Sequence, residues 1–309
     1  MTTDPERRPS DVPTAPWWAD PLSWVEVMAL GNIAFMAVDI GLAHAVNAFA
    51  NPAEWIPVAF SLAAPVVLLV GMVLGGIRPA QAGEGPGRRR FARGLGLAVG
   101  WGSIAVGVAG LLYHLNSAFF EEQTLKNLVY TAPFCAPLAY TGIGLLLILN
   151  RTVDARTVEW ALWVVFLTLG GFVGNFALTL ADHAQNGFFS PWEWAGVVAS
   201  AWAVAACCGL MAAPDNRTMR ALALAVMAVQ MAVGLLGFAL HVRADLASPM
   251  PDLWQKVLYG APLFAPLLLN DIAILGVLAV WAVARVAPKP ADVRAGTAGS
   301  TAPLAGPGG

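Results

Sequence analysis

The chain contains eight apolar stretches, each long enough to cross a lipid bilayer. A bilayer core about 30 Å thick needs about 20 mostly apolar residues in an α-helix. The stretches cover roughly residues 23–45, 55–77, 94–116, 127–149, 158–183, 193–213, 220–242 and 257–284. Hydrocarbon offers no hydrogen-bond partners, so each stretch must satisfy its backbone groups internally, as a helix does. We therefore predict an all-α integral membrane protein with eight transmembrane helices, whose first partner is the lipid bilayer.

The composition agrees with this class of protein. Of the 309 residues, 58% are hydrophobic and only 12% are charged, whereas a soluble domain carries about 25% charged residues. The net charge of −2 gives no indication of a nucleic-acid partner. The three cysteines lie within apolar stretches, where a disulfide framework or a zinc knuckle is not expected.

The two ends of the chain differ from the apolar body. Residues 1–22 lack the basic region, short apolar core and cleavage site of a signal peptide, so we expect a cytosolic leader. Residues 287–309 are rich in alanine, glycine and proline, and we expect a disordered cytosolic tail.

An internal duplication relates the two halves of the apolar body. The stretch LAHAVNAFANPAEW (42–55) aligns without gaps with ADHAQNGFFSPWEW (181–194), GVAGLLYH (107–114) with GLLGFALH (234–241), and YTAPFCAPL (130–138) with YGAPLFAPL (259–267). Four predicted helices separate equivalent positions, so both copies run in the same direction. We therefore predict two parallel four-helix repeats, over residues 23–150 and 151–286.

The distribution of basic residues predicts the orientation. Lysine and arginine accumulate in cytoplasmic loops. Here they gather near the N-terminus, in the loops at 78–93, 151–156 and 217–220, and in the tail, whereas the alternate loops are mainly acidic. Both termini are therefore expected in the cytoplasm of a multi-pass protein of a bacterial-type inner (plasma) membrane.

All four histidines of the chain occupy duplicated positions, and they are the strongest functional signal. His44 pairs with His183, and His114 with His241. Each ends an outward-running predicted helix, so all four imidazoles are expected at similar depth near the outer face. One histidine at a helix C-terminus can simply interact with the helix dipole. Four in register favour a ligand set, because neutral imidazole is a common metal ligand.

Two arrangements of these ligands remain open. In a four-helix bundle, His44 and His114 lie on diagonal helices and suit one haem b, with His183 and His241 on a second. Alternatively, all four surround one or two copper, iron or zinc ions between the halves, since imidazole suits each of these metals. Glycines one and two turns before the histidines would admit either a flat macrocycle or a neighbouring helix, and they are Gly107, Gly110, Gly234 and Gly237.

A second group of polar residues, all duplicated except Asp182, surrounds the predicted ligands. We expect it to support the histidines, and it consists of Glu54, Glu193, Asp182, Asn47 and Asn186. A structural interpretation explains much of the same pattern. The asparagines then cap a helix end, Pro52 and Pro191 begin the next helix, and the glutamates favour its positive N-terminus.

The function predicted from these features is redox chemistry or electron transfer at the outer face, with a quinone or a periplasmic protein as partner. The rival class is a transporter of a small molecule or metal ion. Prolines four apart, in Ala132–Pro137 and Ala261–Pro266, would kink the fourth and eighth helices, and the histidines would bind transiently. A sensor or assembly factor is a third class. The sequence identifies no catalytic residue, substrate or oligomeric state.

Overall fold

The computed structural model describes residues 16–83, 85 and 87–286, and within these it contains helices and turns but no strand. Most of the predicted leader and the whole predicted tail lie outside the described residues. The α-helices are α1 (Pro21–Ala45), α2 (Trp55–Gly75), α3 (Gly87–Leu115), α4 (Leu125–Tyr130), α5 (Leu138–Thr152), α6 (Val158–Gln185), α7 (Glu193–Ala212), α8 (Arg217–Ala247), α9 (Leu253–Tyr259) and α10 (Leu268–Val286), with short 3₁₀ turns at Trp17–Ala19, Pro52–Glu54 and Ala265–Leu267.

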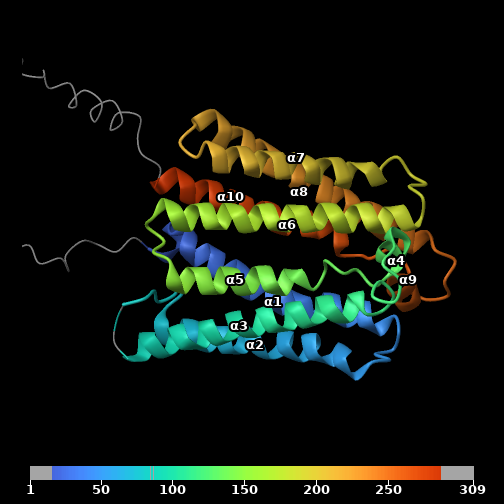
Figure 1. Cartoon of the computed structure of the whole chain (residues 1–309), viewed down its shortest axis with the longest axis horizontal. Helices are drawn as coiled ribbons and strands as arrows, with labels where there is room; N and C mark the ends of the chain where they lie inside the picture. Colours follow the sequence, from blue (N-terminus) through green and yellow to red (C-terminus); the bar gives the residue numbers. More distant parts are fainter. Residues whose placement is uncertain (1–15, 84, 86, 287–309) are drawn as a thin grey trace, which may run out of the picture.

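Seven helices among the described residues are long and apolar enough to cross a membrane, which supports the predicted class of multi-pass helical protein. They are α1, α2, α3, α6, α7, α8 and α10, of which α2 and α10 are counted with the 3₁₀ turns that precede them. The remaining predicted span, the fourth, is represented by α5, which is apolar but has only 15 residues. All eight run side by side along the long axis of the molecule (Figure 1).

The fourth and eighth predicted helices are interrupted rather than kinked. We expected continuous helices at about 127–149 and 257–284, but α4 ends at Tyr130 before α5 begins at Leu138, and α9 ends at Tyr259 before α10 begins at Leu268. Two prolines lie in or beside each interruption. Because proline lacks an N–H group and its ring clashes with the preceding turn, two prolines four residues apart stop the helix here.

Neighbour relations are the same in the two halves of the structure. In the first half α1 packs on α2, α2 on α3, α3 on α5 and α5 on α1; in the second, α6 packs on α7, α7 on α8, α8 on α10 and α10 on α6. The halves meet along two seams, α1 with α10 and α5 with α6. The short helices cross between the halves, since α4 contacts α6 and α9 contacts α1.

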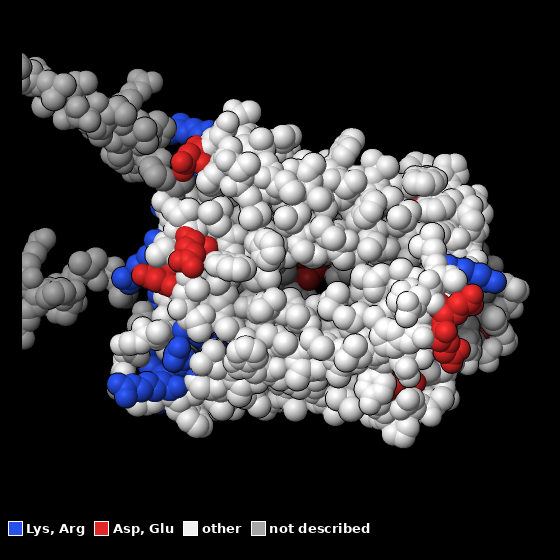
Figure 2. Space-filling model, viewed as in Figure 1, with Lys and Arg blue, Asp and Glu red and all other residues white. Residues whose placement is uncertain are grey.

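The surface has an uncharged band between two charged ends, as a membrane protein requires. Figure 2 shows Lys, Arg, Asp and Glu side chains gathered at the two ends of the long axis. Many apolar side chains along the band are exposed, among them Val73 at 79% and Leu62 at 63%. On the face shown, the band is hollowed near its middle, with an acidic side chain at the bottom of the hollow (Figure 2).

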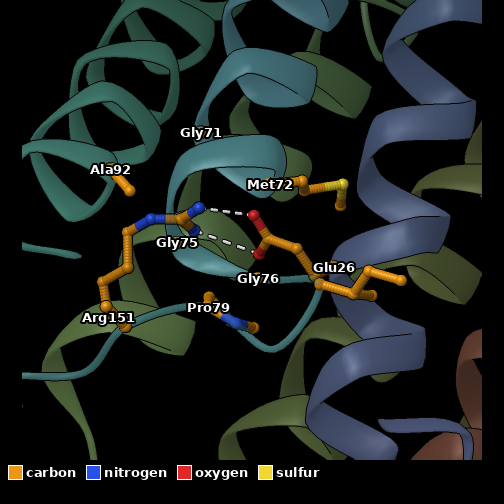
Figure 3. Close-up of a pocket in the computed structure, with 10 residues that line it drawn as sticks. Glu26, Gly71, Met72, Gly75, Gly76, Pro79, Ala92 and Arg151 are labelled. Carbon is orange, nitrogen blue, oxygen red and sulfur yellow. Dashed lines mark hydrogen bonds and ion pairs between the residues drawn. The ribbon is translucent and has the colours of Figure 1, made fainter. Parts of the chain in front are cut away.

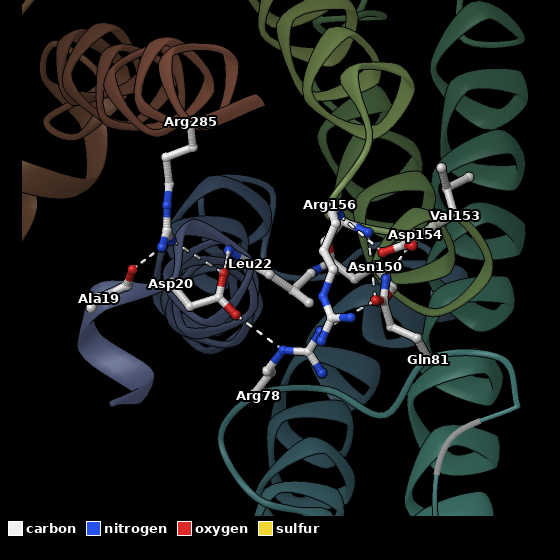
Figure 4. A network of polar contacts seen from close by, with 11 residues as sticks. Ala19, Asp20, Leu22, Arg78, Gln81, Asn150, Val153, Asp154, Arg156 and Arg285 are labelled. Carbon is white, nitrogen blue, oxygen red and sulfur yellow. Dashed lines mark hydrogen bonds and ion pairs between the residues drawn. The ribbon is translucent and has the colours of Figure 1, made fainter. Parts of the chain in front are cut away.

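Both ends of the described chain lie at one end of the bundle, which we call the terminal end. Here Arg285 donates to the carbonyl of Ala19 at 2.5 Å, and Arg78 Nε donates to Asp20 Oδ2 at 3.1 Å (Figure 4). Nearby, Gln81 Nε2 donates to the carbonyl of Val153 at 2.5 Å. This network ties the beginning of α1 to the end of α10 and to the connection between α5 and α6.

One ion pair is buried inside the first half, towards the terminal end. The Arg151 guanidinium of α5 forms two hydrogen bonds with the Glu26 carboxylate of α1, and both side chains are at most 5% exposed (Figure 3). Asn150 Nδ2 donates to the same carboxylate at 3.0 Å. The guanidinium occupies the space that a side chain at Gly96 of α3 would need. A cavity of about 10 Å³, roughly one water molecule, adjoins the pair.

Candidate functional site

The four histidines all lie at the end of the bundle opposite the terminal end, which we call the histidine end. His44 is in the last turn of α1, His114 in that of α3 and His183 in that of α6, while His241 lies in α8 six residues before its end. Because α1, α3, α6 and α8 all run away from the terminal end, their imidazoles share one side of the molecule (Figure 1).

In the first half, His44 faces a carboxylate from the start of the next helix. Its Nδ1 atom lies 3.6 Å from Glu54 Oε2, and both side chains are at most 20% exposed. That separation suits an ion pair with a protonated ring and is long for a hydrogen bond. Asn47 Nδ2 donates to the other carboxylate oxygen, Oε1, at 3.0 Å. The predicted supporting residues Glu54 and Asn47 therefore contact each other and surround His44.

The turn after α1 produces this arrangement. The backbone N–H groups of Asn47 and Phe49 both bond the His44 carbonyl, at 3.3 and 3.1 Å. Asn51 then caps the following 3₁₀ turn by accepting from the Ala53 N–H at 2.9 Å. The structural interpretation is thus correct for the first half's helix start, where Pro52 is the first residue of that turn. Of the two asparagines expected to cap a helix end, Asn186 is the C-cap of α6, whereas the C-cap of α1 is Val46, the residue before Asn47.

The second half repeats this geometry. His183 Nδ1 lies 3.6 Å from Glu193 Oε2. Asn186, with its amide oriented to satisfy its neighbours, donates to the same carboxylate oxygen at 3.2 Å. The aromatic neighbours also correspond: Phe188 stacks on Trp194 with ring centres 4.2 Å apart, as Phe49 stacks on Trp55 at 4.1 Å.

His114 and His241 bind backbone carbonyls in the helix interruptions. His114 Nδ1 lies 3.1 Å from the carbonyl oxygen of Pro133, and His241 Nδ1 lies 2.8 Å from that of Pro262. A carbonyl only accepts, so Nδ1 must carry the proton in both rings. The lone pair of each neutral ring is then on Nε2, where it can bind a metal or accept a proton.

The structure brings the histidines together in pairs. The rings of His44 and His114 have centres 6.3 Å apart and are nearly perpendicular, at 79°. His183 and His241 lie close enough for their charges to interact, and Asp182 interacts with His241 in the same way. Asp182 has no counterpart in the first half, where Ala43 occupies the equivalent position.

Across residues 16–83, 85 and 87–286, no three His, Cys, Asp or Glu side chains are grouped so that they could hold a metal ion. This geometry gives no support to one ion surrounded by four imidazoles.

The glycines near the histidines admit a neighbouring helix. A side chain at Gly110 would lie 2.8 Å from the ring of Pro137, and one at Gly237 would lie 2.8 Å from that of Pro266. Gly107 and Gly234 likewise face the carbonyls of these two prolines. The sequence predicted that these glycines make room either for a flat macrocycle or for a neighbouring helix. At all four positions the close neighbour in the structure is the segment that begins the next long helix.

Sequence reasoning did not identify the prolyl carbonyls as partners of the histidines. The signal was present, because prolines four apart free the carbonyls that a continuous helix would use. Which carbonyl meets which ring depends on the path of the interruption. In the first half this path is fixed by Thr131, whose hydroxyl donates to the His114 carbonyl at 2.9 Å and also bonds Ser117. In the second half, Asp245 accepts from the Ala261 N–H at 2.7 Å.

Comparison with known proteins assigns no relatives: no family model, curated protein or solved structure matches the chain.

Proposed function

We propose that the chain consists of two four-helix repeats, 23–150 and 151–286, and that α4 and α5 together form the fourth of eight membrane spans. Three features support this. The halves share aligned sequence motifs, they have the same helix-to-helix contacts, and the interruptions fall at equivalent positions. The basic loops supply the orientation, with the terminal end in the cytoplasm and the histidine end at the outer face of a bacterial-type inner membrane.

We further propose that the protein is a membrane redox or electron-transfer protein, with one bis-histidine site in each repeat. The observations that carry this proposal are the contact between the His44 and His114 rings, 6.3 Å apart, and the position of Nδ1 of every histidine beside a carboxylate or a carbonyl. Histidines that bind metals usually hold their other ring nitrogen in this way, which fixes the tautomer and the ring orientation.

The spacing of the first pair would allow His44 and His114 to hold one metal ion together. Two imidazoles bound through Nε2 at about 2.0–2.1 Å from a central metal have ring centres about 6 Å apart. The observed separation of His44 and His114 is 6.3 Å. Haem b is the cofactor that this favours; copper, iron or zinc bound by one pair of imidazoles is the alternative.

Each protein group then has a defined task. His44 and His114 would hold the first cofactor, and His183 and His241 the second. Glu54 and Glu193 would orient the ring of their histidine and stabilise positive charge on the site. A bound haem iron would accept or donate one electron at a time. Near the outer face, the electron partner would be a quinone in the bilayer or a periplasmic protein.

Absorption spectra of the purified full-length protein test this proposal. Reduced minus oxidised spectra should show the bands of a low-spin haem, and His114→Ala should remove about half of the haem because each repeat holds its own site. The combined variant His114→Ala/His241→Ala should contain none. Tyr113→Phe, beside His114 but 55% exposed, is the control and should keep full haem content. Colourless, metal-free protein from haem- and metal-replete cells would refute the proposal.

Transport is a second candidate, and the interrupted helices favour it. Discontinuous helices at equivalent positions of two repeats are typical of transporter binding sites near the middle of the bilayer. Asp39 supports this interpretation, because it is an exposed acidic residue within the spanning part of α1. Ionisable residues in such segments usually serve function. Flux into proteoliposomes that is lost in Asp39→Asn, with unchanged cofactor content, would favour transport over electron transfer.

A further inference from the structure

Two acidic residues lie within the apolar part of the bundle, away from both charged ends. Asp39 is six residues before the end of α1, and Asp271 is in the first turn of α10. A hydrogen bond joins Asp271 to Asn32 of α1, which lies about 17 Å from the start of that helix and about 20 Å from its end, at 1.5 Å per residue. Asp271 is therefore near mid-depth, and Asp39 lies about 10 Å nearer the histidine end.

No basic side chain balances these two carboxyl groups. The halves meet along α1, α5, α6 and α10, and the lysines and arginines of these four helices are Arg151 and Arg285. Both lie at the terminal end, where each already has a partner. In the described part of the chain, no ion pair involves Asp39 or Asp271. The titratable neighbour of Asp39 is Tyr140, whose hydroxyl donates to a backbone carbonyl of α2 at 3.0 Å.

A carboxyl group in this position has to be neutralised. An ionised carboxylate without a partner is too costly in hydrocarbon, so such a group either binds a cation or keeps its proton. A metal cation needs several ligands at once, and across residues 16–83, 85 and 87–286 no three His, Cys, Asp or Glu side chains are grouped to hold one. A proton needs a single carboxylate oxygen, which both residues offer.

The packing of α1 changes along its length. Its first part is sealed, because Leu22, Val25, Ala29 and Ile33 are at most 1% exposed. After Ile33 no residue of α1 is buried, and Asp39 is exposed. Asp39 is thus accessible from the side of the histidine end, whereas the part of α1 that leads to the terminal end is closed.

The exposed part of α1 borders the interruption between α9 and α10. Phe35, one turn before Asp39 on the same face of the helix, packs edge to face on Phe264 of the interruption, with ring centres 5.0 Å apart. Figure 2 shows a hollow in the apolar band with an acidic side chain at its bottom. Among the described acidic residues, Asp39 and Asp271 are the two that lie in the middle of the band, so the hollow reaches one of them.

We propose that Asp39 and Asp271 bind protons and form a proton path that opens to the outer face. A proton that leaves an oxygen of Asp271 is accepted by water and passes to the ionised carboxylate of Asp39, and from there to water at the histidine end. The sealed part of α1 closes the path towards the other side. This path goes beyond the bis-histidine sites, and only its outward direction rests on the proposed orientation of the bundle.

Reaction with dicyclohexylcarbodiimide, an apolar reagent that attacks protonated carboxyl groups, tests the proposal on the full-length protein in right-side-out membrane vesicles. At neutral pH, tandem mass spectrometry should find the adduct on Asp39 and on Asp271. Asp39→Asn should remove the adduct from α1, and Asp271→Asn that from α10. Raising the external pH should lower the labelling of both, whereas raising the internal pH should not. Glu159, exposed in the first turn of α6, is the control and should stay unmodified.

The outcomes separate this inference from the proposed function. Folded protein without adducts on both residues would overturn it, because ionised carboxylates do not react. Protection of Asp271 by sodium ions at constant pH would also overturn it, since the occupant would then be a metal ion, and so would labelling that follows the internal pH. If Asp271→Asn does not fold, the fragment spectrum of the wild type still assigns the modified residue. Adducts in protein without haem or metal would support the proton path and refute the bis-histidine sites; the reverse result would do the opposite.

Discussion

Replacing the buried ion pair between Glu26 and Arg151 should change the stability of the protein in a way that can be predicted. The second half of the chain shows which residues to substitute. Under the repeat alignment, Glu26 corresponds to Val165, and Arg151 to Val280, both at most 4% exposed. The same fold position is thus filled once by charges and once by apolar side chains. Replacing a buried ion pair with apolar groups of similar volume is often neutral or stabilising by about 1–4 kcal/mol.

Removing only one charge should be costly, and the two single variants should differ. Breaking a buried pair costs about 3–5 kcal/mol, because the remaining charge has no partner. Glu26→Val leaves a guanidinium that cannot lose its proton, so we expect the upper part of this range. Arg151→Val leaves a carboxylate that can be protonated and still accepts from Asn150, so we expect the lower part. The double variant should be close to the wild type.

The neighbouring glycine sharpens this test. A side chain at Gly96 would overlap the Arg151 guanidinium, so Gly96→Ala should destabilise the wild type by at least about 1–3 kcal/mol through overpacking. Once Arg151 is a valine, the overlap is gone. The same substitution should then be neutral or stabilising by about 1 kcal/mol, the difference in helix propensity between glycine and alanine. The second half has alanine, Ala223, at this position, 1% exposed.

Equilibrium unfolding in mixed micelles, followed by circular dichroism, measures these free energies. The informative quantity is the difference between the effects of Gly96→Ala in the wild type and in Glu26→Val/Arg151→Val. A destabilisation of equal size in both backgrounds would refute the reasoning, because the guanidinium would then not be what excludes a side chain. If Glu26→Val/Arg151→Val is as unstable as Glu26→Val alone, apolar side chains cannot replace the ion pair as they do at the equivalent positions of the second half.

Two further predictions concern the histidine end. Gly110→Ala should destabilise the protein by about 1–3 kcal/mol, because the new carbon would lie 2.8 Å from the Pro137 ring; Gly41→Ala, with nothing within 4 Å, should be tolerated in the same unfolding assay. Asp245→Ala removes the acceptor of the Ala261 N–H, so the free energy of unfolding should fall by about 1–3 kcal/mol. Hydrogen exchange at the Ala261 amide should also become faster. Unchanged exchange there would contradict a role of Asp245 in holding the interruption.

The helical membrane class was predictable because it follows from run length and the chemistry of hydrocarbon. The interruptions near Pro133 and Pro262 were predicted only as kinks. Proline removes hydrogen bonds wherever it stands, but whether a helix bends or stops depends on what satisfies the freed groups. Here His114 and His241, from other helices, take the prolyl carbonyls. Those partners are set by packing, which the local sequence does not encode.

For the candidate site, too, the sequence predicted contacts within one short motif but not contacts that depend on packing. Duplication in the sequence correctly indicated Glu54 as a neighbour of His44, because both belong to one short aligned motif. The contact between His44 and His114 depends instead on how two separate helices meet, which the local sequence does not show.

The contact of Arg285 with Ala19 and Asp20 at the terminal end has a consequence for chain connectivity. The helices α1, α2, α3, α5, α6, α7, α8 and α10 form a closed circuit in which α10 packs on α1. One seam between the halves is therefore covalent, and the other is held by side chains alone. A circular permutant that joins 286 to 16 by a short linker and opens the connection at 153–157 would exchange these two seams. Such a rearranged chain should assemble into the same bundle, as expected if two separate polypeptides once met along both seams.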